Sequence, residues 1–117
     1  MENLLHRPWR WLSMSIAFLI SSVLLSNAQN NAQVQSLFPI NQANATASQN
    51  GSWNNSGTWG GSTPGNNSKV LIPAGRTVTI NSTVNNNIEW IRIEGTLRIT
   101  GNNDTDLNVE TILVPPT

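Results

Sequence analysis

The sequence predicts an all-β fold built as a stacked β-solenoid, and two observations support this prediction. Short β-branched runs alternate with Gly and Pro turns from Lys69 to Thr100. The two halves of this stretch also repeat each other, because apolar residues recur at spacings of twenty-one and nineteen residues. A period of about twenty residues that carries strands and tight turns is typical of solenoid rungs. The matching pairs are Val70 with Ile91, Ile72 with Ile93, Val78 with Leu97 and Ile80 with Ile99.

The composition excludes several classes of function. The 117 residues carry no formal net charge and no Cys, and the one His is His6. Thiolate nucleophiles, Cys/His zinc sites and His-containing triads are therefore not expected beyond the first residues. A neutral chain with 10% charged residues also lacks the basic surface that nucleic acid binding needs, so no nucleic acid partner is expected.

Residues 1–28 have the features of a secretory signal peptide. Arg7 and Arg10 precede an apolar run from Trp11 to Leu25, and small residues end at Ala28, after which we expect cleavage. The alternative is an uncleaved membrane anchor, but the apolar run is shorter than the roughly 20 residues that span a bilayer. The segment predicts a secreted or cell-surface protein that meets the membrane only through its secretion signal.

Residues 29–52 are rich in Asn, Gln, Ala and Ser, and are interpreted as a low-complexity linker. Too few apolar side chains are present to offset the entropy of ordering such a segment. The alternative is that Leu37-Phe38-Pro39-Ile40 lays a short strand across the end of the solenoid.

Residues 53–68 predict a turn-rich entry to the first rung. Gly permits positive φ and Pro presets a turn corner, so the chain can double back twice here. We expect the indoles to cap the exposed end of the solenoid, the alternative being platforms that stack on sugars. The residues of this pattern are Trp53, Trp59, Gly60, Gly61, Pro64 and Gly65.

Alternation assigns faces within the ladder. The repeated Val, Ile and Leu residues point inward, whereas Thr77, Thr79, Arg92, Glu94, Thr96, Arg98 and Thr100 point outward. Corners are predicted at Pro73-Ala74-Gly75 and at Glu94-Gly95. Trp90 shares the outward register of Arg92: it either packs under a neighbouring loop or presents an exposed ring beside a cation, which would suit a ligand. Trp90 and Arg92 are therefore the candidate ligand-binding residues.

The last segment continues the pattern with one irregularity. Leu107 and Val109 keep the alternation, while Ile112 and Val114 resume it one residue out of step, which predicts a bulge or corner near Glu110-Thr111. The chain thus holds two rungs and part of a third, and we expect an incomplete solenoid.

These motifs resemble the G-eight domain of cell-surface and secreted proteins such as fibrocystin, the cell-migration-inducing hyaluronan-binding protein and the transmembrane hyaluronidases. The resemblance covers roughly residues 52–114 and rests on the WGG, PG, IPAG and IEGTL motifs in this order. It implies an extracellular right-handed parallel β-helix, here the N-terminal rungs within a partial domain over 53–117, associated with polysaccharide or hyaluronan binding or turnover. In the family a glycine-bearing segment follows the strand at 112–114, and this chain ends before it. No catalytic residue can be carried over.

Few side chains suggest other chemistry. Asp104 and Asp106 could offer oxygen ligands to Ca²⁺, but the glycine and spacing of an EF-hand loop are missing, so no metal or cofactor is expected. The carboxylates Glu89, Glu94 and Glu110 show no pairing that would predict glycoside hydrolysis.

We therefore expect a non-enzymatic module that supports polysaccharide binding as part of a larger chain. The alternatives are the N-terminal fragment of a polysaccharide-degrading enzyme, hyaluronidase-like, with its active site downstream, and a structural surface adhesin.

Overall fold

The computed structural model describes residues 31–101 and 104–116, which divide into two compact units at Leu37/Phe38. In the first unit residues 31–36 are helical, and the Ser36 hydroxyl donates to the Gln33 carbonyl oxygen at 2.7 Å. The predicted signal peptide over 1–28 lies outside the described residues. Among those that are described, no helix has the length and apolar character needed to cross a membrane.

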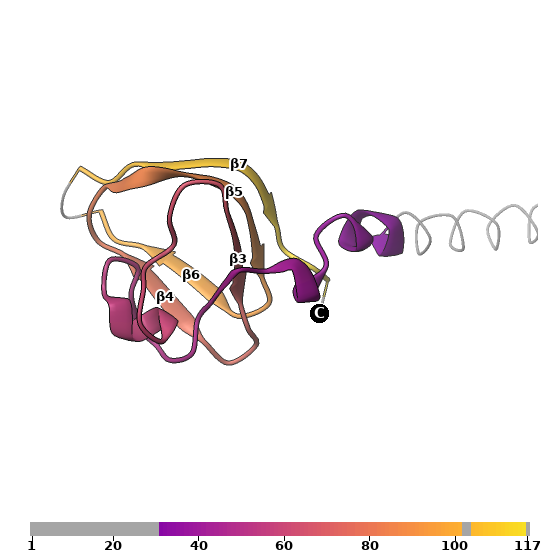
Figure 1. The fold of residues 1–117 in the computed structure, drawn as a ribbon, viewed down its shortest axis with the longest axis horizontal. Helices are drawn as coiled ribbons and strands as arrows, with labels where there is room; N and C mark the ends of the chain where they lie inside the picture. Colours follow the sequence, from indigo (N-terminus) through magenta and orange to yellow (C-terminus); the bar gives the residue numbers. More distant parts are fainter. Residues whose placement is uncertain (1–30, 102–103, 117) are drawn as a thin grey trace, which may run out of the picture. The chain divides into compact units, whose positions relative to one another are not determined.

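The second unit is a β-solenoid of two parallel sheets, which confirms the predicted fold class (Figure 1). The four-stranded sheet has the order β1-β3-β5-β7 and the three-stranded sheet the order β2-β4-β6. Successive strands along the chain alternate between the sheets, so the backbone coils through about three turns. The strands are β1 (Ala45–Thr46), β2 (Gly51–Ser52), β3 (Ser68–Ile72), β4 (Thr77–Ile80), β5 (Val84–Ile93), β6 (Thr96–Ile99) and β7 (Leu107–Leu113).

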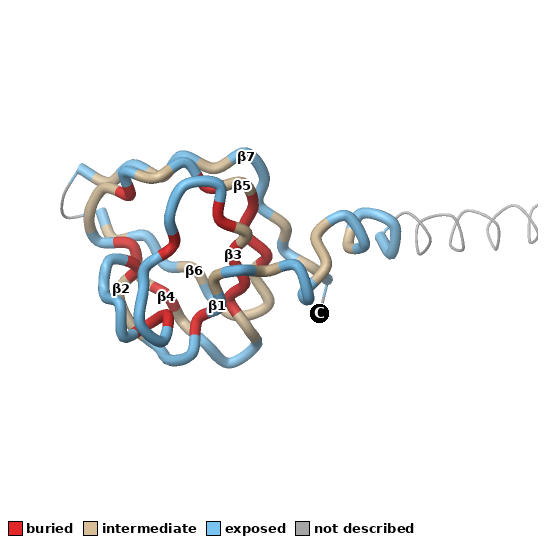
Figure 2. The backbone as a smooth tube through the Cα atoms, viewed as in Figure 1, coloured by how far each residue is buried: buried red, intermediate tan, exposed pale blue. Residues whose placement is uncertain are grey.

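The sequence repeat corresponds to one rung. Val70 lies opposite Ile91 in the β3–β5 ladder, and Val78 lies opposite Leu97 in the β4–β6 ladder. Val70, Val78 and Ile91 have no exposed surface, so the alternating apolar residues form the interior between the two sheets (Figure 2). Because adjacent parallel strands lie about 4.8 Å apart, equivalent inward residues stack directly on one another.

The solenoid begins earlier than the predicted boundary at residue 53. Within the segment interpreted as a linker, Ala45 pairs with Val70 and Gly51 pairs with Val78, which forms a short first rung. Asn side chains stabilise this rung: the Asn44 Oδ1 accepts from Lys69 N at 2.8 Å, and the Asn50 Oδ1 accepts from Thr77 N at 2.9 Å. The linker interpretation is therefore corrected for residues 44–52. The segment around Phe38 is also no strand, because a 3-10 turn, η1 (Ile40–Gln42), follows it.

A second 3-10 turn, η2 (Ser56–Trp59), folds two tryptophans onto the core. Trp53 and Trp59 meet edge to face with ring centroids 5.1 Å apart, and the Trp59 indole Nε1 donates to the Trp53 carbonyl oxygen at 2.7 Å. Gly60 ends η2 with a φ of 77°, a left-handed conformation that Gly adopts without steric cost. Trp53 and Trp59 are both buried, and neither presents a ring face to solvent.

The two predicted corners stack on each other. Gly75 turns the first corner with a φ of 79°. At the second corner a Cβ on Gly95 would collide with the carbonyl oxygens of Pro73 and Arg76. A glycine is therefore required at residue 95 by the close approach of the preceding rung.

The irregularity predicted near Glu110-Thr111 originates in β5. The ladder shifts register between β3 and β5, where Ser68 lies opposite Ile88 and Lys69 lies opposite Trp90. β7 follows β5 without a further shift there, since Ile88 pairs with Val109 and Ile91 with Ile112. The irregularity therefore does not begin in β7. It is a bulge in β5, and β7 repeats it because β7 stays in register with this part of β5.

The last strand of each sheet is left uncovered. β6 and β7 end the two strand orders, and Figure 1 shows β7 as the outermost strand on its side of the solenoid. Ile99 is 58% exposed although its partner Ile80 is fully buried. The interior column of apolar side chains therefore reaches solvent at this end.

Candidate functional site

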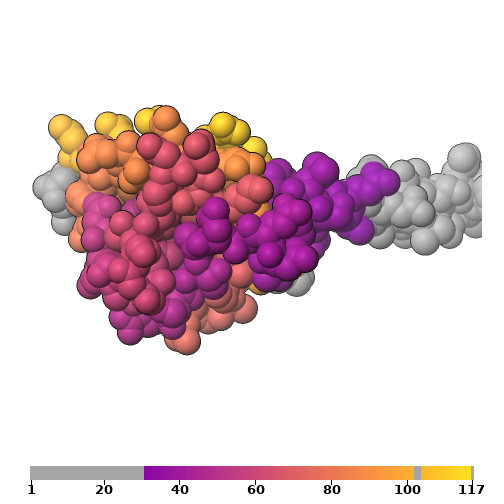
Figure 3. All heavy atoms as spheres, in the orientation of Figure 1, coloured from indigo at the N-terminus to yellow at the C-terminus, as the bar shows by residue number. Residues whose placement is uncertain are grey.

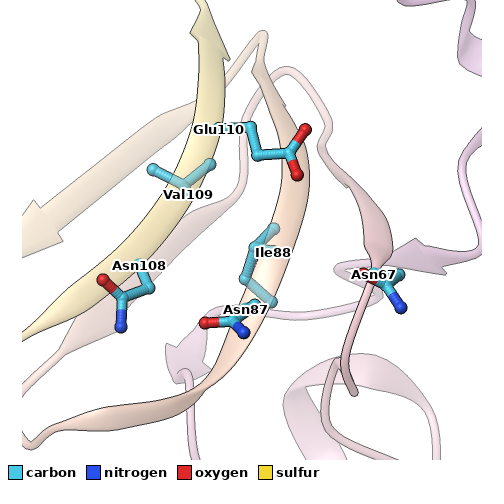
Figure 4. Close-up of a pocket in the computed structure, with 6 residues that line it drawn as sticks. All are labelled: Asn67, Asn87, Ile88, Asn108, Val109 and Glu110. Atoms are coloured by element: carbon cyan, nitrogen blue, oxygen red, sulfur yellow. The ribbon is translucent and has the colours of Figure 1, made fainter.

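An open groove of about 360 Å³ lies beside the start of β3, the middle of β5 and the first half of β7, three neighbouring strands of the four-stranded sheet. Figure 4 shows the amides of Asn87 and Asn108 side by side on β5 and β7, with Asn67 before β3. Glu110 lies further along β7. Ile88 and Val109 complete the lining. The groove therefore combines three amides, one carboxylate and two apolar side chains.

The solenoid period brings these amides together. Asn67, Asn87 and Asn108 are spaced by twenty and twenty-one residues, and Asn87 and Asn108 are direct partners in the β5–β7 ladder. Asn67 has a φ of 61°, a left-handed conformation that Asn tolerates better than most residues. Two hydrogen bonds hold the turn in place: Asn67 N donates to the backbone oxygen of Asn87 at 2.7 Å, and Asn87 N donates to the side-chain Oδ1 of Asn66 at 2.9 Å. The backbone that carries these amides is therefore held by hydrogen bonds between neighbouring rungs.

The groove suits a polar, uncharged ligand. Each Asn amide offers both a donor and an acceptor, and the side chains of Asn67, Asn87 and Asn108 are all exposed. Amides on adjacent strands are about 4.8 Å apart, so they present hydrogen-bonding groups at a regular interval. None of the six lining residues is a cation, and Glu110 would disfavour an anionic ligand at its end of the groove.

Trp90, a predicted ligand-binding residue, is buried in this fold. It is 4% exposed, and its ring meets the ring of Phe38 edge to face at a centroid distance of 5.9 Å. Of the two alternatives drawn from the sequence, packing beneath a neighbouring segment is the one observed. The covering residue comes from the segment that precedes β1, which is drawn in purple in Figure 3.

Arg92, the other predicted ligand-binding residue, is held by the same segment. It is 8% exposed, and its Nη1 donates to the Phe38 carbonyl oxygen at 2.9 Å. Its Nε and Nη2 donate to the Glu94 Oε1 at 3.2 and 3.0 Å. The guanidinium is therefore fixed between the carboxylate of Glu94, which directly follows β5, and a backbone carbonyl fifty-four residues away.

The groove and the covered Trp90 lie next to each other on the outer face of the four-stranded sheet. Thr111 is the ladder partner of Trp90 and directly follows Glu110, which lines the groove. Asn87 and Trp90 are three residues apart on β5, a separation of roughly 10 Å along a strand. The polar row and the tryptophan thus form two parts of one surface.

The remaining candidates do not gather into a site. Asp104 and Asp106 follow residues 102–103, which the structure does not describe. In the described ranges no group of three His, Cys, Asp or Glu residues is placed to hold a metal ion. Sequence reasoning missed the Asn groove, although Asn67, Asn87 and Asn108 recur at spacings of twenty and twenty-one residues, close to the period of the core.

Comparison with known protein families tests the family resemblance that the motifs suggested. A family model described as the G8 domain matches residues 58–117. The chain belongs to the G8 domain family. The comparison with curated proteins and the comparison with solved structures each gave no match.

Membership of the G8 family agrees with the resemblance drawn from the WGG, PG, IPAG and IEGTL motifs. The match begins at Thr58, so it includes Trp59 and both solenoid corners but not the first rung over 45–52. G8 domains are typical of extracellular and cell-surface proteins, and together with the β-solenoid fold this identifies the chain as an extracellular-type module.

Proposed function

We propose that this G8 domain is a non-enzymatic module of a larger secreted or cell-surface protein, and that it binds polysaccharide in the Asn groove. The observation that carries the proposal is the row of exposed amides from Asn67, Asn87 and Asn108 along an open groove. Sugar hydroxyls both donate and accept hydrogen bonds, as amides do, so an array of amides complements a chain of hydroxyls. Val109, which is half-buried, supplies apolar surface for the C–H faces of the sugar rings.

The charge of the groove favours a neutral polysaccharide. Glu110 is exposed at one end, and no lining residue is cationic. The resemblance suggested a hyaluronan-like ligand, whose carboxylates would be repelled by Glu110. We therefore expect a neutral β-glucan to bind more tightly than hyaluronan, and Glu110→Gln to reduce this difference.

Binding of a soluble neutral β-glucan to the purified full chain, measured by isothermal titration calorimetry, tests the proposal. Asn87→Ala should weaken binding about five- to thirtyfold, because it removes the central amide, for which a loss of about 1 to 2 kcal/mol is expected. Asn85→Ala is the matched control, because Asn85 is exposed on the same strand but does not line the groove. Equal affinities for both variants, or no affinity for any polysaccharide tested, would refute the proposal.

A structural role in a surface adhesin is a second candidate, favoured by the exposed interior column at Ile99 and Ile112. Apolar residues in an interior register are ordinarily covered by another rung. In this case polysaccharide would have no effect, whereas Ile112→Lys would reduce self-association of the chain in analytical ultracentrifugation. Release of reducing ends from polysaccharide by a longer gene product would instead identify the parent as a depolymerase.

A further inference from the structure

We infer that the segment around Phe38 is a releasable strap, and that it covers a second sugar subsite formed by Trp90 and Arg92. This inference rests on the proposed function, because the subsite extends the Asn groove. A polysaccharide chain lying in the groove would reach Trp90 with its next residues once the strap has moved away.

Phe38 occupies this place with the same contacts that a sugar residue would make. Its ring packs edge to face against the indole of Trp90, and its carbonyl oxygen accepts from Arg92 Nη1 at 2.9 Å. A sugar ring likewise offers a C–H face that stacks on an aromatic side chain and oxygens that accept from a guanidinium. A bound sugar would therefore replace the contacts of Phe38 by equivalent contacts of its own. Arg92 Nη1 would have a hydrogen-bond acceptor both with the strap in place and with the sugar bound.

The part of the subsite that stays behind is rigid. Arg92 remains oriented by Glu94, which accepts from both Nε and Nη2. Trp90 is flanked in the ladder by Lys69 on β3 and Thr111 on β7, so its backbone is paired on both sides. The indole and the guanidinium are thus already positioned before a ligand arrives, which lowers the entropy that binding costs.

The strap itself is weakly held. Its neighbours Leu37 and Ile40 are 69% and 49% exposed, and the boundary between the two compact units falls directly before Phe38. The pairing with the sheets begins only at Asn44, whose backbone N donates to Lys69 O at 2.9 Å. Local opening free energies are lowest where few apolar contacts are made, so this segment can open while the rungs stay folded.

Phe38→Ala in the full chain tests the strap. We expect it to tighten binding of a long neutral β-glucan oligosaccharide, because a ligand no longer competes with the strap. The gain should be roughly tenfold if the strap covers the subsite about nine-tenths of the time. A short oligosaccharide that fills only the groove should show no gain. Leu37→Ala, at the exposed neighbour, is the matched control.

A second variant and a second readout separate the outcomes. Adding Trp90→Ala to Phe38→Ala should remove the gain, and acrylamide should quench tryptophan fluorescence more strongly in Phe38→Ala than in the wild type. The inference is overturned if quenching is unchanged, or if long and short oligosaccharides gain equally. If the wild type binds through Asn87 while Phe38→Ala has no effect, the strap fails and the proposed function stands. If no variant binds any oligosaccharide, both fail.

Discussion

Substitution of Gly95 by Ala should destabilise the solenoid by about 2 to 4 kcal/mol. The added methyl group would lie against the carbonyl oxygens of Pro73 and Arg76, closer than van der Waals contact permits. Both oxygens belong to the backbone of the preceding corner, so the corner must shift. This shift strains the bonds from Gly95 N to Ile72 O at 3.0 Å and from Thr96 N to Arg76 O at 2.8 Å. Overpacking costs about 1 to 3 kcal/mol, and the two weakened bonds together add about 1 kcal/mol.

Two other glycines provide a graded comparison. Gly75→Ala meets no atom within 4 Å but retains a φ of 79°, so it should cost about 1 to 2 kcal/mol. Gly65→Ala has open space and no left-handed φ, and should change stability by less than about 0.5 kcal/mol. Urea unfolding of the full chain, followed by tryptophan fluorescence and circular dichroism, measures all three. If Gly95→Ala is as stable as Gly65→Ala, the proposed stacking of the two corners is wrong.

Three further predictions concern the core and the first rung. Trp59→Phe should cost about 1 to 3 kcal/mol, because it leaves the buried Trp53 carbonyl oxygen without its indole donor. Ile80→Ala should cost about 2 to 5 kcal/mol, whereas Ile99→Ala, in the same column but 58% exposed, should cost less than about 1 kcal/mol. Asn50→Ala should cost about 1 kcal/mol, because its Oδ1 accepts from β4 at 2.9 Å.

Each of these is measured by the same urea unfolding, and each has an outcome that contradicts it. An unchanged midpoint for Trp59→Phe would mean that the indole bond contributes nothing. Equal losses at Ile80 and Ile99 would mean that the last rung is covered in solution. An unchanged midpoint for Asn50→Ala would mean that the bond from Thr77 N to the Asn50 side chain contributes nothing to stability.

The solenoid itself was predictable because it is encoded locally. β-branched residues at alternate positions specify a strand with one buried face, and Gly and Pro specify the turns between strands. Repetition of Val70 at Ile91 then predicts that the two strands stack, and their pairing in the β3–β5 ladder confirms this.

The first rung was missed because it follows none of these signals. Its strands are two residues long, and Gly51 and Ser52 have low strand propensity. Its strands also lie further from the next rung in sequence: Ala45 is twenty-five residues before Val70, and Gly51 is twenty-seven before Val78. A repeat of about twenty residues, as in the core, therefore does not reveal this rung. Two of its hydrogen bonds to the next rung are accepted by side chains of Asn44 and Asn50, in a segment whose composition suggested disorder.

The sequence by itself determined the β-solenoid class, the inward face of the strands between Lys69 and Thr100, the corners and the likeness to the G8 family, because these depend on residues close together in the chain. Only the tertiary structure decided that Phe38 covers Trp90 and that Asn67, Asn87 and Asn108 share one groove. These contacts join residues twenty to fifty-two positions apart. They depend on how the rungs are offset, and no local pattern specifies that offset.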